Sequence, residues 1–351
     1  MVSSTTREVT PGRLRETVRA VLITQGCVGE VAATVAECLV DADLHGVSSH
    51  GVSRLGIYLE RLRKGAVVGD DAVEVVHEWA TGAILDAGHS FGAWSATRAT
   101  ELCIAKARVS GMATVVTRRA DHFGRAGVFS ERMADAGMIA IVAANTAPLM
   151  PAVGGAEAVI GNNPISIAAP GRSAVSVTDM ALSAVALGKI IEADRAGAPI
   201  PPTWATDAYG EPTTDPAAAR AGLLLPAAGP KGFGLAFFVE VLTGILSGGA
   251  VGAEVRSIYK ERDRPNDCSH VFIAIDVARF GGAELIADRV DSFAARIRSS
   301  ERAPGVDVIL APGDLEHAAA NRNAASITLT SATAAELAMV AAQSGVASPF
   351  D

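Results

Sequence analysis

The chain has 351 residues, of which 49% are hydrophobic and 19% are charged, so it has the length and apolar content for one large or two ordinary globular domains. Thirty Lys and Arg against 38 Asp and Glu leave a net charge of −8, which argues against a nucleic-acid-binding protein because phosphate neutralisation requires clustered cations. No apolar run predicts a transmembrane helix, and residues 1–30 do not have the pattern of a secretory signal.

The cysteines and histidines do not form the spacings of a metal site. Seven histidines include no H-x-H or H-E-x-x-H pair, and the four cysteines include no C-x-x-C pair. We therefore predict no metal and four reduced thiols in a cytoplasmic protein. The four thiols belong to Cys27, Cys38, Cys103 and Cys268.

The first 65 residues are predicted to form an all-helical unit. Apolar residues recur at helical spacing over 11–25, from near Glu30 to Leu44, and from near His50 to Gly65. Pro11 suits the first turn of the first helix, because proline has no amide hydrogen and amide hydrogens of the first turn have no partner within the helix.

Strands and helices alternate irregularly after this unit. Predicted strands lie at 73–78, 83–86, 113–117, 138–144, 165–169, 175–177 and 271–275, with a short extended segment at 308–310. Predicted helices lie at 92–109, 127–136, 181–194, 231–247 and 283–299, and from 332 to the end, with loops at 118–127 and 197–216. This irregular order favours an α+β fold over a doubly wound parallel sheet.

The sequence lacks the usual dinucleotide and nucleotide fingerprints. The nearest approach to G-x-G-x-x-G begins at Gly232 and Gly234 but has Phe237 where the third glycine belongs, and no G-x-x-x-x-G-K-[ST] occurs. Any dinucleotide must therefore be held by something other than a Rossmann motif.

A first candidate site lies in the segment that precedes the third predicted helix. On a helix starting near Ser49, His50 and Arg54 are four residues apart and share one face. A guanidinium fork pairs with a carboxylate while an imidazole moves a proton, so the pair suits an acidic substrate. The alternative is a capped helix start with a solvated face.

A second candidate site is the segment D-H-F-G-R at 121–125, between a predicted strand and a predicted helix. A histidine at such a junction can reach a ligand, and the helix N-terminus favours an anion. The alternative is a capped turn with no ligand.

Two further segments have residues suited to a cofactor. In G-P-K-G at 229–232, the glycines allow a phosphate to approach the backbone and Lys231 can pair with it; the alternative is a tight turn. The following apolar helix contains Glu240 and has no basic face, so we predict a core or dimer helix rather than a membrane-surface helix. Asp179, between a predicted strand and helix, is either an N-cap or the partner of a ribose or a catalytic histidine.

Taken in order, these segments resemble the malate/L-lactate dehydrogenase family of the non-Rossmann type. The motifs run from about residue 12 to residue 330 as S-H-G-x-x-R, H-F-G, G-x-N-P, D-M-A-x-S, G-K-I, T-T-D-P, G-x-K-G-x-G-L and P-G-[DE]. That family includes ureidoglycolate, sulfolactate and diketogulonate enzymes and reductases of cyclic imino acids such as piperideine-2-carboxylate.

The resemblance implies an L-sulfolactate-dehydrogenase-like α+β fold that is not of the Rossmann type. Such a fold has a helical domain made from both chain ends, a mixed-sheet NAD(P)-binding domain and an intertwined homodimer. By this resemblance we expect residues 1–72, completed by about 283–351, to form the helical domain, and residues 73–282 to form the NAD(P)-binding domain.

The resemblance also implies roles for individual residues. His50 is expected to donate or accept the catalytic proton, with Ser49 beside it and Arg54 on the substrate carboxylate. His122 is the second candidate for the proton, placed between substrate and nicotinamide. Asp179 is expected to orient the histidine or to contact the cofactor. The expected cofactor contacts are His122, Gly124, Thr146, Asp179, Met180, Lys231, Gly232, Pro312, Gly313 and Asp314, with Asn162 and Asn163 near the substrate.

The chain departs from the family motifs at several positions. Asn162 replaces the threonine of G-T-N-P, Leu182 replaces the threonine of D-M-A-T-S, and Asp314 replaces the glutamate of P-G-E. Asp121 replaces the asparagine of S-N-H-F-G and is expected to add a charge near the pocket. No departure removes a proton-transfer candidate, so we expect activity.

The sequence therefore predicts an NAD- or NADP-dependent enzyme that transfers hydride between the cofactor and a small 2-oxo or 2-hydroxy acid. One alternative is reduction of a cyclic 2-imino acid, and another is a binding protein that has kept the site without catalysis. The substrate side chain, the choice of cofactor and the stereochemistry at C2 stay open. Neither a nucleic acid nor a membrane is expected as a partner.

Overall fold

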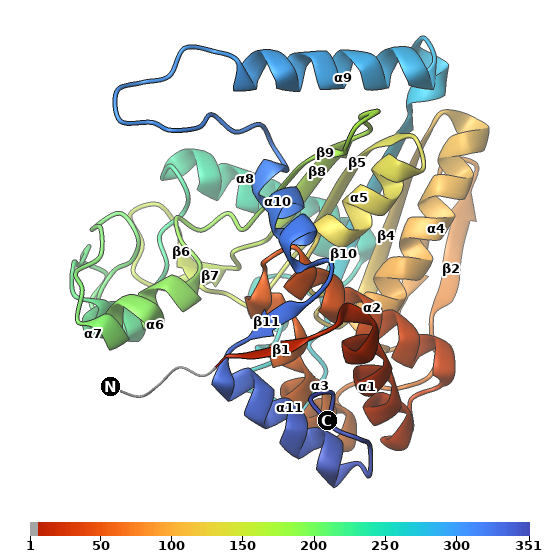
Figure 1. The fold of residues 1–351 in the computed structure, drawn as a ribbon. Helices are drawn as coiled ribbons and strands as arrows, with labels where there is room; N and C mark the ends of the chain where they lie inside the picture. The colour runs from red at the N-terminus through yellow and green to blue at the C-terminus, as the bar shows by residue number, and fades with distance from the viewer. Residues whose placement is uncertain (1–5) are drawn as a thin grey trace.

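A seven-stranded mixed sheet lies at the centre of the computed structural model, which describes residues 6–351 (Figure 1). Its strand order is β2-β3-β4-β10-β5-β8-β9. In chain order these strands are β2 Glu74–Trp79, β3 Gly82–Asp86, β4 Met112–Ala120, β5 Met138–Ala144, β8 Ile165–Ala169, β9 Ser176–Met180 and β10 Cys268–Asp276. β3 and β4 run parallel, whereas the other neighbours in the sheet are antiparallel. The predicted α+β class is confirmed.

Successive side chains of the central strands point to opposite faces of the sheet, so the apolar core is divided between the two faces. Val115 and Phe272 belong to the large apolar cluster on one face, while their neighbours Val116 and Val271 belong to the cluster on the other. The first face is covered by α4 Gly92–Ser110 and α5 Gly127–Asp135, and the second by α8 Pro230–Glu240 with the π-helical turn η3 Val241–Ile245 (Figure 1).

The two ends of the chain meet in one helical unit. Strand β1 Arg7–Val9 pairs antiparallel with β11 Ile327–Leu329. Around this pair lie α1 Pro11–Thr24, α2 Gly29–Leu44, α3 Leu55–Arg63 and α11 Ser331–Gln343 (Figure 1). Apolar side chains from both ends, such as Leu14 and Leu337, are buried in the same cluster. A helical part built from both chain ends is thus confirmed, whereas the exact boundaries 1–72, 283–351 and 73–282 stay a prediction.

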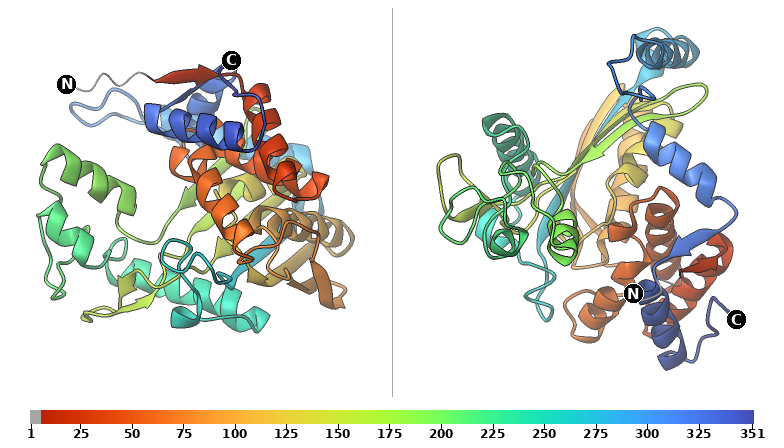
Figure 2. Two further views of the ribbon diagram at one scale, coloured as in Figure 1. Left: turned by 90° about the horizontal axis from the view of Figure 1, so that it is seen from below. Right: turned by 60° about the vertical axis from the view of Figure 1, so that its left-hand side comes forward.

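Helix α9 Ala283–Arg298 lies at the end of the sheet remote from the chain-end helices (Figures 1 and 2). It is attached to the β8–β9 turn, where Arg172 pairs with Asp288 at 2.5 Å and the Ser173 hydroxyl donates to Asp291 at 2.7 Å. Helix α10 Asp314–Asn323 then returns to α2. The remaining elements are α6 Leu187–Ala196, α7 Pro216–Ala221, β6 Met150–Pro151 and β7 Ala158–Ile160, with 3-10 turns at Ser48–His50, Val52–Arg54, Gly252–Glu254 and Val277–Phe280.

Several predicted boundaries were wrong. The third helix begins at Leu55 rather than near His50, because two 3-10 turns precede it. The helix predicted at 181–194 begins at Leu187, because β9 continues to Met180 and an irregular segment follows. The helix predicted at 231–247 changes from α to π at Val241. The predicted strands at 113–117, 175–177 and 271–275 are parts of the longer β4, β9 and β10. The helix predicted from 332 to the end stops at Gln343, close to Gly345 with its φ of +65°. No local pattern indicated β1, β6, β7, β11, α7 or α10.

Among residues 6–351, no helix combines the length and apolar character needed to cross a bilayer. Within that range, no group of three or more His, Cys, Asp or Glu side chains is placed to hold a metal ion. The four cysteines are buried and unpaired.

Candidate active site

His50 and Arg54 lie on two consecutive 3-10 turns between α2 and α3. The buried Asp43 carboxylate fixes this segment by accepting a hydrogen bond from the Val52 amide at 2.8 Å. Ser49 lies 3.0 Å from His50 between Oγ and Nδ1, and Arg54 Nε donates to the Ser49 carbonyl at 2.5 Å. The α-helical face predicted for this segment was wrong, but the turns bring the same three side chains together.

His122 lies on the loop between β4 and α5 and faces His50. The two imidazoles are stacked, with centroids 5.5 Å apart and planes inclined by 16°. Tyr58 on α3 is hydrogen-bonded to His122, with its hydroxyl 2.7 Å from Nδ1. Gly92 permits this arrangement, since a Cβ there would lie 1.9 Å from the Asp121 carbonyl oxygen. The structure thus joins both proton-transfer candidates in one site.

The environment favours the neutral form of both histidines. Burial, together with the positive charges of Arg54 and Arg125, lowers the pKa of His50 to about 4. Burial lowers the pKa of His122 well below its ordinary value, and a charge on His50 would lower it further. The two rings therefore compete for one proton, and the site holds an uncharged imidazole ready to accept it.

Asp121 does not add an uncompensated charge to the pocket, contrary to expectation. Its side chain is buried and pairs with the equally buried Arg61 at 2.5 Å. Its other oxygen accepts from the His122 amide at 2.8 Å. Burial raises the pKa of the Asp121 carboxyl, with Arg61 opposing the rise. Asp121 therefore holds the backbone of the His122 loop through this hydrogen bond, while its charge is balanced by Arg61.

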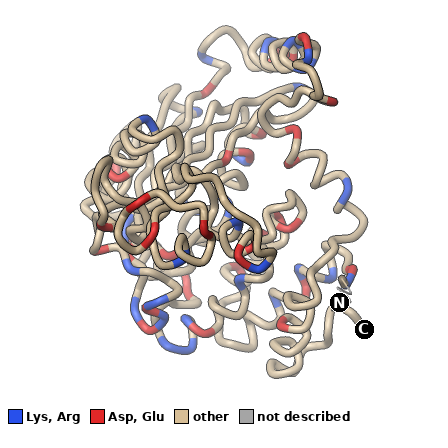
Figure 3. The backbone as a smooth tube through the Cα atoms, turned by 90° about the vertical axis from the view of Figure 1, so that its left-hand side faces the viewer, with Lys and Arg blue, Asp and Glu red and all other residues tan. Residues whose placement is uncertain are grey.

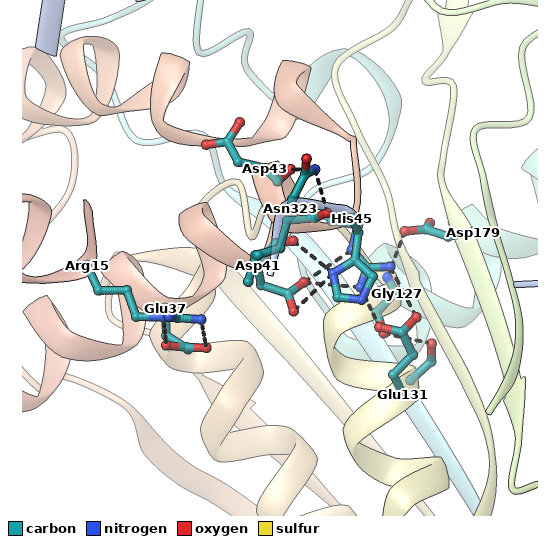
Figure 4. A network of polar contacts seen from close by, with 12 residues as sticks. Arg15, Glu37, Asp41, Asp43, His45, Gly127, Glu131, Asp179 and Asn323 are labelled. Carbon is teal, nitrogen blue, oxygen red and sulfur yellow. Dashed lines mark hydrogen bonds and ion pairs between the residues drawn. The ribbon is translucent and has the colours of Figure 1, made fainter. Parts of the chain in front are cut away.

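Asp179 lies at the end of β9 and accepts from the Gly127 amide, the first residue of α5, at 2.7 Å (Figure 4). It caps the N-terminus of α5, not that of the helix predicted to follow it. Burial raises its pKa to about 6 despite nearby Arg125, which is itself held by Asp41 and Glu131. Within residues 6–351 the hydrogen bonds of Asp179 do not include either site histidine, and Tyr58 occupies the orienting position on His122.

Thr146 and Asn162 form a second group at the end of β5. Thr146 Oγ1 donates to Asn162 Oδ1 at 2.9 Å, and the Thr146 amide donates to Asn163 Oδ1 at 3.0 Å. The buried Glu240 carboxylate of α8 supports them, accepting from Asn163 Nδ2 at 2.8 Å and from Asn145 Nδ2 at 3.1 Å. This network fixes the Thr146 backbone relative to α8.

The start of α8 has the chemistry to bind a dinucleotide phosphate. Gly229 has φ +62°, and Pro230, the first helical residue, has no amide hydrogen, whereas the Gly232 amide donates to the Ala227 carbonyl at 3.0 Å. Lys231 is exposed and, among residues 6–351, makes no ion pair. A Cβ on Gly232 would lie 2.1 Å from the Ala227 carbonyl oxygen, so this turn requires glycine. The residues therefore fit an anionic cofactor group at Lys231.

The other predicted cofactor contacts are spread over separate elements. Gly124, with φ +87°, is in the His122 loop, and Met180, at the end of β9, is 44% exposed. Pro312, Gly313 and Asp314 lead into α10, where Asp314 pairs with Arg298 at 2.7 Å. Within the described residues, no hydrogen bond or ion pair connects these groups to the two histidines. Direct contacts thus unite Ser49, His50, Arg54 and His122, whereas the predicted cofactor residues other than His122 are separate.

The sequence interpretation missed three residues around the histidines. Tyr58 lies in the third predicted helix, and its position four residues after Arg54 is a signal that it shares the face of a site residue. Arg61 had a weaker signal, as a cation among the apolar residues of that helix. Tyr259, whose ring lies 5.2 Å from the Arg54 guanidinium carbon, had none, since it is distant in sequence.

Comparison with known proteins agrees with this fold. The family model described as malate/L-lactate dehydrogenase matches residues 9–338. L-sulfolactate dehydrogenase of Methanocaldococcus jannaschii is 39% identical over 291 residues, covering 83% of this chain and 84% of that protein. Ureidoglycolate dehydrogenase (NAD(+)) of Escherichia coli O157:H7 is 36% identical over 301 residues, 86% of each chain. (2R)-3-sulfolactate dehydrogenase (NADP(+)) of Chromohalobacter salexigens is 37% identical over 308 residues, 87% of this chain and 90% of that protein.

Solved structures share the whole fold. Sulfolactate dehydrogenase from Methanocaldococcus jannaschii superimposes with a TM-score of 0.92 at 35% identity, covering 97% of this chain and 98% of that one. Delta1-piperideine-2-carboxylate reductase from Pseudomonas syringae pvar. tomato superimposes with a TM-score of 0.85 at 28% identity, covering 95% of this chain and 99% of that one.

Proposed function

This chain belongs to the malate/L-lactate dehydrogenase family, and from that membership we propose that it interconverts a 2-hydroxy acid and the corresponding 2-oxo acid. It is a dehydrogenase that uses NAD or NADP. The observation that carries the proposal is the stacked pair His50 and His122 beside Arg54, which combines proton transfer with carboxylate recognition.

Arg54 is the residue we propose for the substrate carboxylate. Its Nε is occupied by the Ser49 carbonyl, which leaves both terminal nitrogens available. Among residues 6–351 it has no carboxylate partner, so its charge is not neutralised within the chain. A planar guanidinium can then bind a carboxylate through two parallel hydrogen bonds.

His50 is the residue we propose to exchange a proton with the substrate oxygen, with His122 as the second candidate. In oxidation the neutral imidazole accepts the hydroxyl proton, and in reduction the imidazolium returns it. Ser49 and Tyr58 each hold one ring nitrogen, which orients the two rings. When bound, the nicotinamide accepts or supplies the hydride. We further propose that Lys231, Thr146 and Asp314 hold the cofactor and that Asn162 faces the substrate.

A cyclic 2-imino acid is the alternative substrate class. The likeness to a piperideine-2-carboxylate reductase supports it, and such a substrate presents the same carboxylate next to the reacting carbon. With this substrate the histidine would protonate nitrogen rather than oxygen. Asn162 and Leu182 depart from the family motifs, so the substrate of any one relative is not assigned to this chain.

The test is the loss of nicotinamide absorbance with NADH and with NADPH against a substrate panel. The panel contains pyruvate, oxaloacetate, 2-oxoglutarate, sulfopyruvate, oxalurate and the cyclic imines of proline and pipecolate. Turnover of an open-chain oxo acid supports the proposal, and its side-chain preference identifies the substrate. Turnover of the cyclic imines alone establishes the alternative, and no turnover with either cofactor overturns both.

We also propose a cytoplasmic homodimer in which a second copy covers the outer face of α8 and η3. Six apolar side chains on this face are between 36% and 61% exposed, and an exposed apolar patch is typical of a protein–protein interface. They are Leu235, Phe237, Phe238, Leu242, Ile245 and Leu246. The four buried, unpaired thiols suit a reducing compartment.

A further inference from the structure

Tyr259 lies beside Arg54 although it is about two hundred residues away in sequence. It belongs to the irregular segment between the 3-10 turn Gly252–Glu254 and β10. Its ring faces the Arg54 guanidinium at 5.2 Å, within the range of a cation–π contact. The Tyr259 side chain is 50% exposed, so the site has not buried it as a core residue.

The segment that carries Tyr259 is attached to α3 at two adjacent residues. Arg61 Nη1 donates to the carbonyls of Glu261 at 3.3 Å and Arg264 at 3.2 Å. Glu60 pairs with Arg262 at 2.6 Å. Because α3 begins immediately after Arg54, these bonds fix the position of the Tyr259 segment relative to Arg54.

Arg61 connects this segment to the histidines as well. Its Nη2 pairs with Asp121, whose other oxygen accepts from the His122 amide. One buried guanidinium therefore connects the Tyr259 segment, α3 and the His122 loop. The placement of Tyr259 is thus set by the framework that positions the proposed catalytic groups.

An aromatic ring is a partner that orients Arg54 without neutralising it. A carboxylate in the same place would compete with the substrate for the guanidinium, whereas a ring covers one face and leaves the edge nitrogens free. With Nε held by the Ser49 carbonyl, the ring restricts the remaining rotation of the side chain. The guanidinium is then ordered before the substrate arrives, which lowers the entropy cost of binding.

We propose that Tyr259 is a positioning residue for substrate binding, acting through Arg54 to hold the guanidinium in the orientation that accepts a carboxylate. This inference rests on the proposed function, because it gives Arg54 the substrate carboxylate. It predicts that changes at Tyr259 affect substrate affinity and leave the chemical step and cofactor binding unchanged.

The test compares Tyr259→Ala, Tyr259→Leu and Tyr259→Phe in the full-length enzyme. A cation–π contact at an exposed site is worth about a 2- to 5-fold change in affinity, so Tyr259→Ala is expected to raise KM for the oxo or imino acid by that factor, with kcat and the cofactor KM unchanged. Tyr259→Phe keeps the ring and is expected to restore the wild-type KM. Tyr259→Leu keeps bulk without the ring and is expected to resemble Tyr259→Ala.

Binding provides a readout that does not depend on turnover. Oxamate, an unreactive analogue of a 2-oxo acid, is titrated into the complex with NADH or NADPH and followed by nicotinamide fluorescence. Its Kd is expected to rise by the same factor in Tyr259→Ala. Tyr209→Ala is the matched control, since Tyr209 is 87% exposed on the loop between α6 and α7 and is expected to change neither value.

Failure of this inference and failure of the proposed function give different results. An active wild type with unchanged KM and oxamate Kd in Tyr259→Ala, or a Tyr259→Leu that behaves as wild type, overturns the inference alone. A wild type that turns over no member of the panel and binds no oxamate overturns the proposed function and the inference together.

Discussion

At the scale of residues, the site consists of two imidazoles that cannot both be charged. His50 and His122 are stacked 5.5 Å apart, and each is oriented by a neighbouring hydroxyl, from Ser49 and Tyr58. Burial removes the water that would solvate two positive charges, so the first proton bound opposes the second. An uncharged pair beside an unneutralised Arg54 is suited to accept one proton from an acidic substrate.

Replacement of each histidine by asparagine distinguishes their roles. His50→Asn is expected to lower kcat by about 10²- to 10⁴-fold, the usual contribution of a positioned acid or base, with little change in cofactor affinity. His122→Asn serves as the comparison in steady-state assays, with cofactor binding measured by fluorescence. Wild-type kcat in His50→Asn together with a large loss in His122→Asn would assign the proton to His122.

The pH dependence follows from the low pKa of His50, about 4 in the free enzyme. Because its neutral form predominates above that value, kcat/KM for oxidation of the hydroxy acid is expected to be flat from about pH 6 to 8. Reduction needs the protonated ring, so its kcat/KM is expected to fall about tenfold per pH unit over that range. Initial rates in both directions test this, and a reduction rate that is flat over that range would contradict it.

At the scale of elements, the structure departs from regular helix where the functional side chains lie. Asp43 caps the Val52 amide and thereby interrupts the helix that the apolar spacing predicts from His50 onward. The helix predicted over 231–247 becomes a π turn after Glu240, where Gly244 packs against the backbone of Ala250. Apolar periodicity reports which face is buried but does not distinguish α, 3-10 and π turns.

Two glycines of this long helix provide a matched pair of substitutions. Gly244→Ala places a Cβ 2.4 Å from the Ala250 carbonyl oxygen and 2.9 Å from Asn145 Nδ2, so it is expected to destabilise the protein by about 1–3 kcal/mol. Gly234→Ala meets no atom within 4 Å and is expected to leave stability unchanged or raise it by up to about 1 kcal/mol. Urea denaturation measures both, and equal midpoints for the two variants would refute the tight packing at Gly244.

At the scale of the whole molecule, local patterns predicted the sheet-and-helix order but not the contacts between distant segments. Strand β1 and strand β11 have three residues each and form only because the chain ends meet, so neither had a local signal. The charge of Asp121 was foreseen, yet its neutralisation by Arg61 on α3 was not. The order of the motifs identified His50, Arg54 and His122. No local sequence pattern indicated Tyr259, which lies beside Arg54 only in the folded chain.

The apolar face of α8 and η3 predicts an assembly. Acidic and basic residues are interspersed along the chain in Figure 3, and α8 contributes only Lys231 and Glu240 to them. Phe238→Glu, at a residue 61% exposed on this face, is expected to shift a dimer toward monomer in sedimentation velocity. Val109→Glu, at a residue 80% exposed on α4, is the control and is expected to leave the mass unchanged. A wild-type monomer at micromolar concentration would rule out the dimer.

The most direct test of the central proposal follows the hydride itself. The enzyme is incubated with the panel and with NADH or NADPH deuterated at both C4 positions, and the product is examined by mass spectrometry and NMR. One deuterium at C2 of a hydroxy or amino acid product is the predicted result, since the cofactor supplies the hydride and a histidine supplies the proton. A reduced product without deuterium at C2, or no reduced product at all, would contradict direct hydride transfer at this site.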